Sequence, residues 1–250
     1  MTSSLAFYLV AVPAVLLTGL SKGGFGGALG GIAVPLMALV MPPATAAGIM
    51  LPILCLTDWF GFRPYYGKWD TAQLKVMIPG GLAGIALGTV AAGGLRPATV
   101  RVIVGAIAVA FALYRLLAAG AGARAAPRSA VRGILWSAVS GFTSFIAHAG
   151  GPPVMVYLVP QRLDRTTYVA TSNLFFLVMN AAKLLPYLWL GQLSLPNVRA
   201  SAIQAPLVPL GVWLGLWLHR RIEERRFARL VVLFMLATGA QLLWQGLRGG

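Results

Sequence analysis

Three charged residues lie where the surrounding sequence is apolar: Lys22, Asp58 and Lys183. A charge inside a membrane is costly, so an ionisable residue in an apolar stretch is a candidate for function. Either lysine could bind an anion, and the carboxyl group of Asp58 could carry a proton. Each residue could instead form a buried pair or extend its charge to the surface, and the sequence leaves these alternatives open.

Glycine and proline clusters interrupt two apolar stretches. Leu5–Met41 contains the cluster Ser21–Gly31, and Gly133–Val159 contains His148–Pro153. Such clusters end or kink helices, and irregular backbone at membrane depth is tolerated only inside protein or beside a wet cavity. Free N–H groups at a helix start attract anions. We therefore expect both interruptions to meet near the membrane midplane and to form an anion site.

The candidate substrate-binding residues combine the backbone of the two interruptions with polar side chains of a later apolar stretch, Tyr168–Leu190. Hydroxyl and amide groups could orient an anion, although in membrane helices they commonly bond neighbouring helices. A single histidine is as readily a packing residue as a proton carrier. The candidates are Lys22, Gly23, Gly24, Gly26, Gly27, His148, Gly150, Gly151, Thr171, Ser172, Asn173, Asn180 and Lys183, with Asp58 as the proton-coupling candidate.

Composition places these residues in an all-α integral membrane protein. Hydrophobic residues make up 58% of the 250-residue chain, charged residues 10%, and the mean hydropathy is +0.81. Soluble domains carry about 25% charged residues. The net charge of +15 comes from basic residues between apolar runs, which indicates topology signals rather than nucleic-acid binding.

About eight transmembrane helices are expected, because a membrane helix needs about 20 apolar residues. The two interrupted stretches count as the first and fifth of them. The six full-length candidates are Ala44–Phe62, Leu74–Ala92, Val102–Ala119, Tyr168–Leu190, Val198–Leu218 and Phe227–Trp244.

Basic residues decide between two topologies. If each interrupted stretch crosses once, the two sides of the membrane carry equal numbers of them. If each interrupted stretch enters and returns, the basic residues of the connecting segments gather on one side of the membrane. Only Arg96, Arg101, Arg199 and Arg248 then lie on the other side. The positive-inside rule favours the second arrangement. It predicts both termini on the non-cytoplasmic side of an inner membrane.

The same arrangement divides the chain into two pseudosymmetric halves, which we expect to be inverted. Residues 1–119 form the first repeat, 120–132 a basic cytoplasmic linker, and 133–250 the second repeat. The offset from Gly26 to Gly150 also aligns Gly27 with Gly151 and Gly67 with Gly191. Weak internal symmetry of this kind is typical of secondary transporters.

The sequence does not favour an enzyme. It lacks Cys-x-x-Cys, His-Glu-x-x-His, nucleophile-elbow and P-loop motifs. With 2 His, 1 Cys and 5 acidic residues, neither a metal site nor a cofactor is expected. The expected partners are a small anion and the lipid bilayer, and a homodimer is left open.

The interruptions and their surroundings resemble the TauE/SafE sulfite-exporter family. The resemblance covers nearly the whole chain and rests on Gly19–Gly27 with Val34-Pro35-Leu36, then Gly141–Ser144, Gly150–Pro153, Ala170–Asn173 and Asn180–Lys183. It implies export of small sulfur-containing anions, such as sulfite or an organosulfonate like sulfoacetate, from the bacterial cytoplasm. Proton coupling is an expectation at family level, and His148 departs from the small residue common at its position.

We therefore interpret the chain as a secondary transporter with its anion site between the interruptions. An anion channel would use the same site but pass unitary currents. A membrane scaffold or assembly protein would need no charged midplane site, and substitution of Lys22 would leave its function intact.

Overall fold

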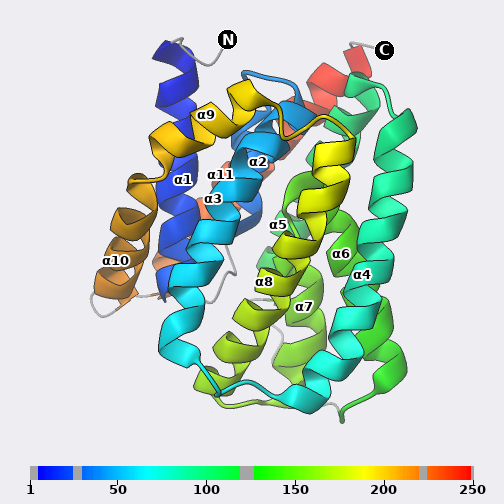
Figure 1. The fold of residues 1–250 in the computed structure, drawn as a ribbon, viewed down its shortest axis with the longest axis vertical. Helices are drawn as coiled ribbons and strands as arrows, with labels where there is room; N and C mark the ends of the chain where they lie inside the picture. Colours follow the sequence, from blue (N-terminus) through cyan, green and yellow to red (C-terminus); the bar gives the residue numbers. More distant parts are fainter. Residues whose placement is uncertain (1–4, 25–29, 119–126, 220–223, 249–250) are drawn as a thin grey trace.

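The computed structural model describes residues 5–24, 30–118, 127–219 and 224–248, and every regular element in these ranges is helical. The long helices stand side by side along the long axis of the molecule (Figure 1). In chain order the elements are α1 (Leu5–Gly24), η1 (Gly30–Ile32), α2 (Ala33–Met37), α3 (Pro43–Phe62), η2 (Arg63–Tyr65), α4 (Thr71–Gly94), α5 (Pro97–Ala118), α6 (Ala130–Ala147), α7 (Gly151–Leu158), η3 (Val159–Gln161), α8 (Arg165–Trp189), α9 (Leu195–Gln204), α10 (Leu207–His219) and α11 (Glu224–Arg248).

Six helices of the described chain are long and apolar enough to cross a membrane, namely α1, α3, α4, α5, α6 and α8. The spans expected at Ala44–Phe62, Leu74–Ala92, Val102–Ala119 and Tyr168–Leu190 correspond to α3, α4, α5 and α8. The protein is therefore a multi-pass, all-helical membrane protein.

The bounds of the described helices near the two glycine-rich clusters are as follows. α6 ends at Ala147 and α7 begins at Gly151. α1 ends at Gly24, and the next described element, η1, begins at Gly30. Gly26 and Gly27, two of the expected anion ligands, lie outside the described residues.

The expectation of one continuous span over Val198–Leu218 is wrong. This segment is divided between α9, which lies across one end of the bundle, and α10 (Figure 1). Pro206 follows the end of α9 and has no N–H for a helical bond to the carbonyl four residues earlier. The Ala205 N–H bonds instead to the Ala202 carbonyl at 3.3 Å, closing a tight turn. Phe227–Trp244, the last expected span, lies within α11.

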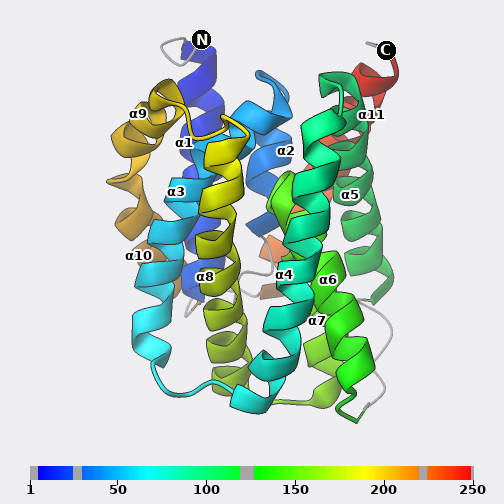
Figure 2. The ribbon, with the colours of Figure 1, turned by 45° about the vertical axis from the view of Figure 1, so that its right-hand side comes forward.

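α1 begins and α11 ends at the same end of the bundle, here called the terminal end (Figures 1 and 2). The opposite end, here called the loop end, carries the α3–α4 and α7–α8 connections. The main packing pairs of helices are α1 with α10, α4 with α6, α5 with α11, and α3 with α8.

Glycines allow two of these pairs to approach closely. A Cβ atom on Gly84 of α4 would lie 2.0 Å from the Ala138 carbonyl oxygen of α6. One on Gly23 of α1 would lie 2.2 Å from the Val212 carbonyl oxygen of α10. Small residues favour such contacts in membranes, where van der Waals packing rather than water exclusion holds helices together.

Candidate functional site

Lys22 and Asp58 form a buried ion pair between α1 and α3. The Lys22 Nζ atom lies 2.5 Å from Asp58 Oδ1, and the two side chains are 5% and 0% exposed. Asn180 of α8 donates from Nδ2 to Asp58 Oδ2 at 2.5 Å. Lys22 Nζ also lies 4.7 Å from the centre of the Phe176 ring, a cation–π distance. The positive charge of Lys22 is thus matched by a carboxylate inside the protein.

Lys183 forms a second polar cluster, which holds no carboxylate. Its Nζ atom lies 3.1 Å from the Ser144 carbonyl oxygen, 3.0 Å from Ser144 Oγ and 2.8 Å from His148 Nδ1. Lys183 is fully buried. The ion pairs that the described side chains form are Lys22–Asp58 and Arg128–Asp70, and neither includes Lys183. A protonated Lys183 is therefore a buried cation that forms no ion pair with any described carboxylate.

The tautomer of His148 follows from its two neighbours. An ammonium group can only donate, so His148 Nδ1 must accept from a protonated Lys183. The proton of a neutral ring then resides on Nε2, which lies 3.0 Å from the Ala47 carbonyl oxygen and donates to it. The ring also stacks on Tyr187, with centres 5.9 Å apart and planes 27° apart.

The end of α6 positions His148. This residue has φ 51° and ψ 28°, and its N–H bonds to the Ser144 carbonyl. The Ala149 N–H bonds to the Thr143 carbonyl, which completes a helix-ending turn. The left-handed region costs an L-residue roughly 1–2 kcal/mol, although histidine enters it more readily than most. Buried contacts of the imidazole offset this cost.

A small central cavity lies between the two clusters. It measures about 20 Å³ as space for the centre of a water molecule, which is room for about one water. Its walls come from both halves of the chain. They consist of Lys22, Gly31, Leu54, Ser144, His148, Gly151, Phe176 and Asn180.

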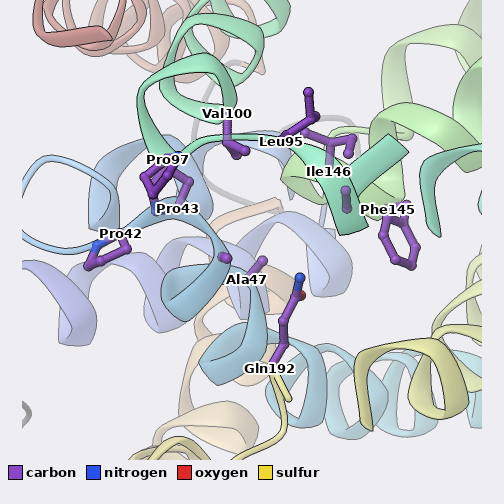
Figure 3. Close-up of a pocket in the computed structure, with 11 residues that line it drawn as sticks. Pro42, Pro43, Ala47, Leu95, Pro97, Val100, Phe145, Ile146 and Gln192 are labelled. Atoms are coloured by element: carbon purple, nitrogen blue, oxygen red, sulfur yellow. The ribbon is translucent and has the colours of Figure 1, made fainter. Parts of the chain in front are cut away.

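A second, larger cavity opens near the terminal end and is here called the outer cavity. It measures about 100 Å³ and is lined mainly by apolar residues of the α2–α3, α4–α5 and α8–α9 connections and their flanking helices. Figure 3 shows its lining, with the Gln192 side chain pointing toward the other labelled residues. Ala47 lines this cavity, and its carbonyl accepts the hydrogen bond from His148. His148 therefore lies between the outer and central cavities.

The structure brings together some of the expected site residues. Lys22, His148, Gly151 and Asn180 line the central cavity. Lys183 and Asp58 lie directly behind its walls, through contacts with His148 and Lys22.

Other expected site residues have packing or structural contacts instead. Thr171 Oγ1 accepts from the Asp70 N–H at 2.9 Å, and Asn173 Nδ2 donates to the Gly61 carbonyl at 3.0 Å. Gly23 packs on α10, and the Gly150 carbonyl accepts from Ser140 Oγ at 2.7 Å. Gly24 lies in the last turn of α1. Within the described chain, Ser172 Oγ has no hydrogen-bond partner and is buried.

Sequence reasoning missed Ser144, Phe176 and Gly31 as site residues. Ser144 lies one helical turn before His148, so the spacing could have revealed that both face one side. Phe176 and Gly31 carry no chemical signal that separates them from other apolar positions. In the part of the chain that the structure describes, no three His, Cys, Asp or Glu residues gather as metal ligands.

Comparison with known proteins gives the family. The sequence pattern described as "Sulfite exporter TauE/SafE" matches residues 11–242, nearly the whole chain. No curated protein and no solved structure matches. The chain therefore belongs to the sulfite exporter TauE/SafE family of membrane transporters.

Proposed function

We propose that this protein is a secondary transporter that exports small sulfur-containing anions, sulfite or an organosulfonate such as sulfoacetate, across the bacterial inner membrane. The observation that carries the proposal is the buried Lys183, which contacts no carboxylate among the described side chains and lies behind the wall of a central cavity. Lys22 is already neutralised by Asp58. An anion in an enlarged central cavity would supply the counter-ion that Lys183 lacks.

Recognition would combine charge with hydrogen bonding. A sulfite or sulfonate group carries several acceptor oxygens, which need donors once they leave water. Asn180 and the Lys22 ammonium group line the cavity and can donate. Lys183 would act through the Ser144–His148 wall or reach the anion directly when the cavity widens.

The charge distribution supports export from the loop end. Arg63 and Lys68 lie in the α3–α4 connection, Arg162 in the α7–α8 connection, and Arg128 shortly before α6. These segments belong to the loop end, whereas Arg96 lies in the α4–α5 connection at the terminal end (Figures 1 and 2). Under the positive-inside rule, this distribution supports a cytoplasmic loop end, with both termini on the opposite side.

Helix packing supports two inverted repeats, 1–119 and 133–250. If α1 to α5 correspond in order to α6, α7, α8, the α9–α10 pair and α11, the contact of α4 with α6 maps onto that of α10 with α1. The contacts of α3 with α8 and of α5 with α11 map onto themselves, as a two-fold axis requires. The aligned glycines Gly67 and Gly191 also share a positive φ, 76° and 69°.

Alternating access would arise from movement of one packed unit against another around the central cavity. The cavity has room for about one water and is too small for a sulfonate, so it must widen before an anion can enter. The outer cavity lies on the terminal-end side of His148 and would form the exit path. A site that must widen before it admits the anion favours a carrier over an open channel.

Binding of sulfite and sulfoacetate to purified protein tests this proposal. Lys183→Met should weaken binding by about 10- to 100-fold, because a charged hydrogen-bond partner contributes about 1.5–3 kcal/mol. The control is Lys68→Met, which removes an exposed lysine of the α3–α4 connection and should leave affinity unchanged.

The outcomes separate the alternatives. Unchanged binding in Lys183→Met would place the anion site elsewhere. Failure of the wild type to bind either anion would refute the sulfur-anion function. Unitary currents in lipid bilayers, instead of saturable flux into vesicles, would show the channel.

A further inference from the structure

Lys183 and His148 place two basic groups in direct contact inside the protein. Their nitrogen atoms lie 2.8 Å apart, and the residues are 0% and 7% exposed. Two positive charges at this distance repel strongly where little water screens them. The pair therefore has two accessible protonation states. Either both groups are neutral, or the pair holds one extra proton and carries a single positive charge.

The contacts of Lys183 suit both states. A protonated ammonium group has three donors, and the contacts with the Ser144 carbonyl, Ser144 Oγ and His148 Nδ1 use all three. A neutral amine has two donors and one lone pair. It can still donate to the Ser144 carbonyl and to His148 Nδ1, while the Ser144 hydroxyl rotates and donates to the amine. Neither state leaves a buried polar atom without a partner, so loss of the proton breaks no contact.

Asp58 lacks this tolerance. Its two carboxylate oxygens contact the Lys22 ammonium group and the Asn180 amide N–H, and both of these are donors. Protonation would remove the counter-ion of buried Lys22 and set an O–H against another donor. The geometry thus favours Lys183 over Asp58 as the residue that gains and loses a proton.

The charged and titratable groups around the pair come from several helices. The charged or titratable groups within electrostatic range of Lys183 include Lys22 of α1 and Asp58 and Cys55 of α3. Tyr187 of α8 stacks on His148, and its hydroxyl donates to the Phe145 carbonyl at 2.5 Å. Lys22 and Asp58 form a neutral pair, so their combined influence on Lys183 is smaller than that of either charge alone.

We propose that Lys183 and His148 form a proton-binding site that takes up one proton together with the transported anion. This inference rests on the proposed function and deepens it. The proton adds to the neutral amine of Lys183 and gives the ammonium group that neutralises the anion; on release, the same proton returns to water. His148 keeps its Nε2 proton on the Ala47 carbonyl, and its Nδ1 atom accepts from Lys183 in both states. Anion and proton then favour each other's binding by the same factor.

The test uses methanesulfonate, which stays singly charged in neutral and weakly acidic solution, so any proton taken up belongs to the protein. Calorimetry in two buffers of different ionisation enthalpy counts the protons bound per anion. In the wild type the count should rise toward one as the pH increases, and affinity should fall by up to about tenfold per pH unit once Lys183 is neutral in the free protein. A count of zero and a flat affinity from about pH 5 to about pH 9 would overturn the proposal.

Two variants locate the proton. Lys183→Arg keeps the charge but does not release its proton, so anion binding should persist with a proton count of zero. The double variant Lys22→Met with Asp58→Asn, which removes both charges of the buried ion pair, should keep the wild-type count. Loss of proton uptake in this double variant with its retention in Lys183→Arg would assign the proton to Asp58 and overturn the proposal.

A further readout leaves Lys183 and His148 unchanged, and a variant serves only to assign the signals. Nitrogen NMR of labelled histidine, with His219→Gln to assign the chain's 2 histidines, should show His148 as the Nε2–H tautomer. Its Nδ1 shift should change with pH as Lys183 titrates. An Nδ1–H tautomer, or an Nδ1 shift that does not change with pH, would refute the proposal that Lys183 and His148 form a proton-binding site. If no sulfonate or sulfite binds, the proposed function and the coupling both fail; if the anion binds without a proton, the coupling alone fails.

Discussion

Breaking the ion pair between Lys22 and Asp58 should destabilise the protein far more than removing both charges. The two atoms lie 2.5 Å apart with almost no exposure, and at an effective dielectric constant of 20 this separation corresponds to about 6–7 kcal/mol of attraction. The cost of taking both charges out of water offsets most of that attraction. Loss of one partner leaves the other buried and unmatched, which costs about 3–5 kcal/mol.

We therefore expect Lys22→Met to lower the free energy of unfolding by about 3–5 kcal/mol, and the melting temperature by on the order of 10 °C. Asp58→Asn should have a similar effect, because it leaves the Lys22 ammonium group unmatched. The double variant should recover most of the loss, since it buries no charge.

The assay is a double-mutant cycle by thermal unfolding of purified protein in one detergent. Lys68→Met, at an exposed position, is the matched control and should change stability by about 0.5 kcal/mol or less. Additive effects of the two single substitutions would refute the reasoning, because they would show that the charges do not depend on each other.

Three further perturbations follow from the structure. Gly84→Ala should destabilise by about 1–3 kcal/mol in thermal unfolding, because its Cβ would overlap the Ala138 carbonyl of α6; Gly94→Ala, with nothing within 4 Å, is the control. Thr171→Val should cost about 1–3 kcal/mol, because it leaves the Asp70 N–H without its acceptor; an unchanged melting temperature would contradict this. Asp164 caps α8, and hydrogen bonds from the Thr167 hydroxyl and N–H lower the pKa of its carboxyl group below the usual 3.8. A lowered pKa in the folded state means that this stabilisation is present above pH 3.8 and is lost as the pH falls through the folded value. The stability difference between wild type and Asp164→Ala should therefore shrink in acid, and a difference that grows there would contradict the sign.

Much of the helical framework could be predicted because a membrane imposes a local rule. A span must be long, apolar and self-bonded, and these requirements can be read along the chain. α3, α4, α5 and α8 lie where hydropathy predicted them, and α6 ends at Ala147, directly before the His148–Pro153 cluster. Val198–Leu218 met the same rule and yet divides into two helices. Proline does not settle such cases, because Pro13, Pro52, Pro79 and Pro186 lie inside helices that continue.

The buried charged residues near the candidate site could be identified from the sequence, but their pairings could not. The cost of a buried charge singled out Lys22, Asp58 and Lys183 wherever the helices lay. Asp58 could have paired with either lysine. The polar run Thr171-Ser172-Asn173 looked equally suited to a ligand, but Thr171 and Asn173 contact Asp70 and Gly61 at the ends of α4 and α3.

The sequence by itself determined that the protein is a helical membrane protein, which residues carry charge into the membrane, and its family. These properties depend on composition, on spacing along one chain and on local motifs. Only the tertiary structure decided that Lys22 is matched by Asp58 and that Lys183 contacts His148. Such pairings depend on how α1, α3, α6 and α8 rotate and pack against one another, and distances across helices are not encoded in any one segment.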